Sequence, residues 1–182
     1  MVEAEISLSQ ARFPEAKAKA EKVLALAGTQ FPAMTIGAKS VLGLAQAYGG
    51  AAASGKQTVA DAVEVAKRLN DPGQLAEAQF ALAEALLLAR DSQTALTNAL
   101  EAQKTFGRCG QQESEWRAWL IAALASRGAG DSGKTREYAL QSSESLSKLE
   151  QRLGAANFNS YLSRPDVQRL RKQLNDVAGS SK

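Results

Sequence analysis

The clearest pattern of apolar and polar positions lies near the end of the chain. Val167, Leu170, Leu174 and Val177 recur at helical spacing, and charged residues fill the positions between them. Such a stripe is typical of a helix with one buried face. Elsewhere no run of β-branched residues bounded by turn residues indicates a strand. The pattern predicts an all-α chain.

The boundaries of the helices are marked by proline and aspartate. Each of the four prolines precedes a helix-forming stretch, where its missing N–H would have no partner in any case. Asp71 and Asp91 are expected N-caps, because their carboxylates can accept the free N–H groups of a first turn. A frayed tail is expected from Gly179 to Lys182. Helices are predicted at 2–11, 14–28, 32–49, 56–70, 72–90, 92–107, 111–127, 132–153 and 165–177, with a short turn or helix at 155–161.

These helices recur in similar pairs. Leu42-Gly43 lies 40 positions before Leu82-Ala83, and each is in the middle of the first helix of a pair. Second helices also correspond, since Ala95 and Ala102 align with Thr135 and Ser142. A period of about 34 to 45 residues, built from two helices, indicates an α-solenoid.

The pairs resemble the tetratricopeptide repeat (TPR). That family places a small residue after a leucine midway along the first helix and small residues seven positions apart on the second. Two departures are Trp119-Leu120 in the fourth unit and Ala51–Gly55, which is expected to lengthen a turn. The resemblance implies a helical repeat array over 1–153, with a partial repeat at 1–31 and repeats at 32–70, 71–109 and 110–153, followed by a capping helix and tail at 154–182.

Two further features suggest a larger protein. The first unit has room for only half of a normal first helix, so the chain is expected to be the C-terminal part of a longer one. The stretch 158–166 resembles the ends of repeat regions in large bacterial multidomain proteins.

Composition narrows the chemistry. The chain has no histidine and one cysteine, Cys109, which excludes the familiar Cys/His zinc sites and catalysis by Ser–His or Cys–His pairs. The net charge of +3 comes from interleaved charges, and the basic stretch 164–172 is interpreted as a solvated face. We expect a cytoplasmic, non-enzymatic protein without cofactor or metal, and with no nucleic acid or membrane as partner.

One motif requires weighing against that expectation. Gly128–Thr135 matches the phosphate-loop pattern G-x-x-x-x-G-K-[ST], in which Gly128, Gly133, Lys134 and Thr135 would hold a nucleotide. A true loop follows a buried parallel strand, whereas Trp116–Arg127 aligns with a first helix of the repeat. We interpret the match as a decoy in which Gly128–Gly130 lengthen a turn. A strand at Trp119–Ala125 would reverse that interpretation.

The expected function is a scaffold that binds a partner protein or peptide in a concave groove lined by first helices. A nucleotide-binding module or NTPase that uses Gly128–Thr135 is the alternative from another class, and a self-associating helical scaffold is a third. The candidate partner-binding residues are Ser40, Leu44, Tyr48, Glu77, Phe80, Glu84, Leu88, Arg117 and Ile121.

Overall fold

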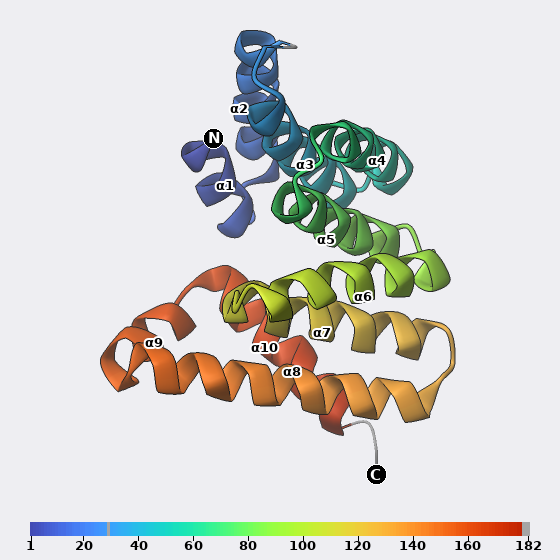
Figure 1. Cartoon of the computed structure of the whole chain (residues 1–182), viewed down its shortest axis with the longest axis vertical. Helices are drawn as coiled ribbons and strands as arrows, with labels where there is room; N and C mark the ends of the chain where they lie inside the picture. Colours follow the sequence, from blue (N-terminus) through green and yellow to red (C-terminus); the bar gives the residue numbers. More distant parts are fainter. Residues whose placement is uncertain (29, 180–182) are drawn as a thin grey trace. The chain divides into compact units, whose positions relative to one another are not determined.

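The computed structural model describes residues 1–28 and 30–179. Within them every regular element is a helix, which confirms the predicted all-α array of antiparallel helix pairs with a C-terminal capping helix. Of the expected tail, Gly179 ends the last helix, and Ser180–Lys182 lie outside the described residues. The helices are α1 (Val2–Ser9), α2 (Phe13–Ala27), α3 (Pro32–Tyr48), α4 (Ala52–Leu69), α5 (Pro72–Leu88), α6 (Ser92–Arg108), α7 (Gln112–Gly128), α8 (Ser132–Leu153), α9 (Ala155–Leu162) and α10 (Pro165–Gly179) (Figure 1).

The chain divides into two compact units. The N-terminal unit, Met1–Asp91, contains α1 to α5, and the C-terminal unit, Ser92–Lys182, contains α6 to α10. Consecutive helices pack on each other within each unit, and α3 also packs on α1 and α5. First helices of successive pairs therefore contact one another, as in a repeat array. The division falls inside the predicted repeat 71–109 and places α5 and α6 in different units.

A single type of turn ends the first helix of every pair. The third residue after the end of the helix always adopts an extended conformation, and the one before it has a positive φ: Ala11, Gly50, Arg90 and Gly130. These positions are 39, 40 and 40 residues apart. After α3, for example, Gly50 N–H bonds to Ala47 C=O at 3.2 Å and Ala51 N–H to Gln46 C=O at 2.9 Å. This pair of bonds is the Schellman motif, which satisfies the last free carbonyls of the helix.

The uniform turns correct two predictions. Ala51–Gly55 was expected to lengthen a turn, but α4 begins at Ala52 and Gly55 is a buried helical residue. Gly128–Gly130 was also expected to lengthen a turn, but Gly128 is the last residue of α7. Glycine suggested a loop in both places; at Gly55 the neighbouring helix instead demands a residue without a side chain.

The closest approach of two helices joins α3 and α4 at Gly43 and Gly55. A Cβ atom added to Gly43 would lie 2.7 Å from Gly55 C=O, and one added to Gly55 would lie 2.8 Å from the Ala47 Cβ. Backbone therefore packs directly on backbone. Alanine supplies more than half of the buried hydrophobic residues of the chain, so small side chains set the helix spacing in general.

The C-terminal unit ends in a cap with large side chains. Val167, Leu170, Leu174 and Val177 of α10 are all buried, which confirms the apolar stripe predicted from the sequence. They join a cluster that includes Trp116 of α7, whose side chain is fully buried. Figure 1 shows α7 and α8 side by side, and α10 packs against both.

Two glycines of α3 test the backbone contact. We expect Gly43→Ala to lower the free energy of unfolding by about 1–3 kcal/mol, because Gly55 and Val59 must move away. The matched control is Gly37→Ala in the same helix, where the new methyl meets only the flexible end of Met1. That change should be neutral or stabilise by up to about 1 kcal/mol through helix propensity. Equal effects of both changes in chemical denaturation would contradict the packing described here.

Candidate functional site

Predicted partner-binding residues of the N-terminal unit are used in contacts between its own helices. The Tyr48 ring stacks on the Phe13 ring, with centroids 5.2 Å apart and planes 6° apart. The Tyr48 hydroxyl donates a hydrogen bond to the Glu84 carboxylate. Leu44 is 8% exposed and packs against residues of α4 and α5. Tyr48 and Glu84 thus join α3 to α5, and Leu44 belongs to the core rather than to a surface.

The other predicted residues of this unit are more accessible. Glu77 is exposed, whereas Ser40, Phe80 and Leu88 are partly buried. All four lie on α3 or α5, the helices that were expected to carry them. They stay predicted partner contacts.

In the C-terminal unit, Arg117 forms a clamp between α7 and the start of α10. Its guanidinium lies 3.0 Å from the Asp166 carboxylate and 3.0 Å from Glu113. Arg164 reaches the same two carboxylates, at 2.9 and 3.2 Å. The Arg117 side chain is only 17% exposed. Ile121, one turn further along α7, is buried. Neither residue is placed as the groove prediction requires, because both serve the packing of the cap.

Electrostatics favour the ionised form of this clamp. Burial alone would raise the pKa of Asp166, but hydrogen bonds from Arg164 and the charges of Arg117 and Arg164 lower it below its ordinary value. Burial raises the pKa of the Tyr161 hydroxyl, which accepts a hydrogen bond from Trp116 Nε1 at 2.8 Å. Asp166 is therefore a buried charge with two cationic partners, the condition under which such a charge is tolerated.

The phosphate-loop-like segment lies between two helices. Trp119–Ala125, the stretch whose conformation was to decide the question, is part of α7. Asp131 caps α8 by accepting the Lys134 backbone N–H at 2.9 Å, and its other oxygen lies 3.7 Å from Lys134 Nζ. The Thr135 hydroxyl donates to Asp131 C=O at 2.7 Å. The groups that would hold phosphate and Mg²⁺ are thus engaged by Asp131, and a carboxylate stands where a phosphate would bind.

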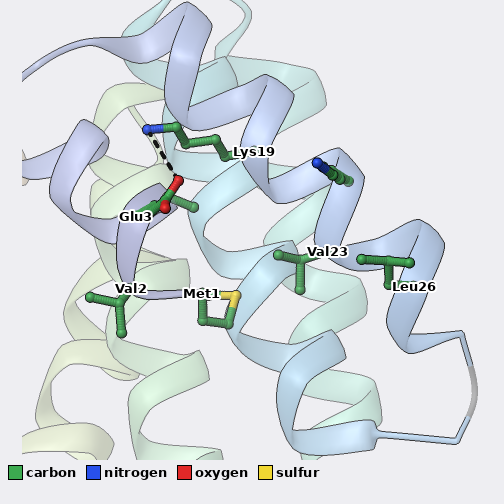
Figure 2. Close-up of a pocket in the computed structure, with 8 residues that line it drawn as sticks. Met1, Val2, Glu3, Lys19, Val23 and Leu26 are labelled. Atoms are coloured by element: carbon green, nitrogen blue, oxygen red, sulfur yellow. Dashed lines mark ion pairs between the residues drawn. The ribbon is translucent and has the colours of Figure 1, made fainter.

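The most open apolar feature of the N-terminal unit lies between α1 and α2. A pocket of about 380 Å³ is lined by Val2 and Glu3 of α1 and by Val23 and Leu26 of α2, together with Met1 (Figure 2). Its other lining residues are Ala4, Lys19 and Lys22. We call this feature the N-terminal pocket.

Exposed hydrophobic residues gather around the N-terminal pocket. Seven large ones are exposed in the described part of the chain, and five of them lie between residues 2 and 34. Leu26 is 75% exposed and Val2 67%. Met34 lies one turn before Gly37, whose Cα faces the Met1 side chain, so the apolar surface reaches α3. We define the N-terminal patch as Val2, Ile6, Val23, Leu26 and Met34.

The sequence contained a signal for this patch that the groove hypothesis left unused. In α1, Ala4 faces the core, yet Val2 and Ile6 lie on the opposite side and are also apolar. In α2, Val23 and Leu26 lie outside the buried stripe of alanines. A helix that is apolar on two sides has a second face to cover.

Comparisons with known proteins add no identification: no family model matches the chain, and no curated protein matches it. No helix formed by the described residues is both long and apolar enough to cross a membrane. The same residues bring together no group of three His, Cys, Asp or Glu side chains able to hold a metal ion.

Acid should weaken the clamp at Asp166. Its pKa is lowered in the folded state and is about 3.9 when the chain is unfolded. The stabilisation is therefore complete above about pH 4 and is lost as the pH falls through the folded-state value. We expect Asp166→Asn to lower the free energy of unfolding by about 1–3 kcal/mol at neutral pH, and this deficit should shrink below pH ~4. Glu144→Gln, at an exposed position of α8, is the control. A deficit independent of pH in urea titrations would contradict the role of the Asp166 charge.

Nucleotide binding is expected to be absent at Gly128–Thr135. Isothermal titration with Mg-ATP or Mg-GTP at millimolar concentration should give no heat of binding. Lys134→Ala should change stability by less than about 0.5 kcal/mol, since its side chain is exposed. Asp131→Ala should cost about 0.5–2 kcal/mol, because the cap of α8 is lost. An affinity that Lys134→Ala abolishes would establish a nucleotide site instead.

Proposed function

We propose that this chain is a non-enzymatic protein-interaction scaffold that binds a partner protein through its N-terminal patch. The supporting observation is the difference between the first and the last helices of the chain. The cap helix α10 buries its whole apolar stripe and leaves charged residues such as Arg171 and Lys172 outside. At the other terminus, Val2, Ile6 and Leu26 remain exposed on α1 and α2.

This difference matters because of how repeat arrays are built. Each repeat buries an apolar face against its neighbour, so terminal helices need a polar outer face to stay in solution. Contiguous apolar surface on a folded protein commonly marks a site of interaction. A partner that covers the N-terminal patch would do for α1 and α2 what α10 does for α7 and α8.

The resemblance to the tetratricopeptide repeat is part of this proposal. Turns spaced by 39 and 40 residues support a two-helix repeat. The spacing is longer than the 34 residues of the usual TPR, so the family itself rests on the quoted motifs. Such arrays commonly act by presenting helix surfaces to other proteins. The concave surface, to which Ser40, Glu77 and Leu88 were assigned, is a second place for the partner to extend.

Site-specific photo-cross-linking tests the proposal. A photoreactive amino acid at position 26 should form a covalent adduct with the partner in the cells that produce the protein, because Leu26 lies in the N-terminal patch. The same amino acid at position 140 is the matched control, since Leu140 is also an exposed leucine but lies on α8.

Two results would contradict the proposal. Adducts formed equally at positions 26 and 140 would indicate non-specific contact with apolar residues. No adduct at position 26, in a variant whose helical circular dichroism matches that of the wild type, would show that the N-terminal patch is not a docking surface.

A further inference from the structure

The N-terminal pocket has the arrangement that receives another helix. Along α2, its lining residues Lys19, Lys22, Val23 and Leu26 follow the spacing i, i+3, i+4, i+7. This is one continuous stripe along the helix, about 10 Å long. It is distinct from the stripe of Ala16, Ala20 and Ala27 that α2 buries in the core. Val2 of α1 forms the other wall (Figure 2).

Charge distinguishes the two lysines of the stripe. Lys19 lies 3.8 Å from Glu3 and 3.9 Å from Glu15, so its charge is compensated within the chain (Figure 2). Lys22 is exposed, and no carboxylate of the described residues lies within 4.0 Å of its ammonium group. The pocket thus combines an apolar floor with one uncompensated cation at its rim.

We infer that the N-terminal pocket holds one amphipathic helix of the partner protein, with its apolar stripe over Val2, Val23 and Leu26 and a flanking Asp or Glu against Lys22. This inference rests on the proposed function and deepens it by naming the kind of partner. Two helices side by side offer a groove into which the ridge of a third can pack. A carboxylate beside the apolar stripe of the incoming helix would complement Lys22 and fix its register.

Other occupants fit the same surface less well. A bilayer is flat, whereas the pocket is concave, and Glu3 in its lining would oppose binding to an anionic lipid surface. A second copy of the chain would place the same patch opposite itself, so the uncompensated Lys22 would bring a second positive charge into the interface. An extended peptide would need a free sheet edge, and the described residues form only helices.

Two synthetic peptides provide the probes. Both are about 18 residues long, about 27 Å as a helix, and carry the same stripe of leucines at helical spacing. The acidic-flank peptide has glutamates beside the stripe, and the basic-flank peptide has lysines in those positions. Binding of each labelled peptide to the full chain is followed by fluorescence anisotropy at low salt, where surface charges are least screened.

We expect the acidic-flank peptide to bind the wild type about threefold or more tightly than the basic-flank peptide, the scale of one exposed ion pair. Lys22→Glu should reverse this order. Leu26→Ser should weaken both peptides by about tenfold or more, since a buried leucine contact is lost. The control Leu140→Ser should leave both affinities unchanged. Circular dichroism should be the same for all variants, because positions 22, 26 and 140 are exposed.

Several outcomes would overturn the inference. Affinities that ignore Leu26, or a peptide preference that Lys22→Glu leaves unchanged, would show that no helix binds in this manner. Dimerisation in light scattering that Leu26→Ser abolishes would make a second copy the occupant. Sedimentation with phosphatidylserine vesicles that Leu26→Ser abolishes would make it a membrane. If adducts at position 26 persist while both peptides fail, the scaffold proposal stands and the amphipathic helix is wrong.

Discussion

Close approach between helices is the constraint on which this structure depends. At Gly43 and Gly55 the backbones of α3 and α4 touch, and alanine occupies most other buried positions of the repeats. Small residues contribute little hydrophobic area each, so stability must come from many short contacts over long helix surfaces. The cap is built differently, with Trp116, Phe158 and Tyr161 filling a wider space between α7, α9 and α10. That change of side-chain size lets α10 cross the end of the last pair.

The electrostatic clamp complements this apolar cap. Asp166 lies at the first turn of α10, where a negative charge also suits the positive end of a helix. Arg117 and Arg164 hold it from α7 and from the preceding turn. The C-terminal unit therefore ends in a surface with no apolar residue left to cover. The N-terminal unit lacks such an arrangement around Val2 and Leu26, which is why a docking role is assigned to that surface.

The sequence predicted the helices well because their signals are local. Pro32, Pro72 and Pro165 each stand at the first position of a helix, and Asp71 caps α5 by accepting N–H groups of the next two residues but one and two. The groove residues failed for the opposite reason. Tyr48 meets Glu84 across 36 positions and Arg117 meets Asp166 across 49, and no local pattern indicates such pairs. A polar or aromatic residue on a helix face was assigned to a ligand when its partner lay elsewhere in the same chain.

The repeated Schellman turn has a consequence for how such a chain can change its length. Each first helix hands over to its second helix through the same pair of backbone bonds, at positions 39 or 40 residues apart. The junction depends on a left-handed residue and not on a particular side chain, since alanine, glycine and arginine all occupy it. A duplication or deletion of one such block in the gene would therefore join matching backbone geometries. Genetic recombination could add or remove whole helix pairs without having to invent a new connection.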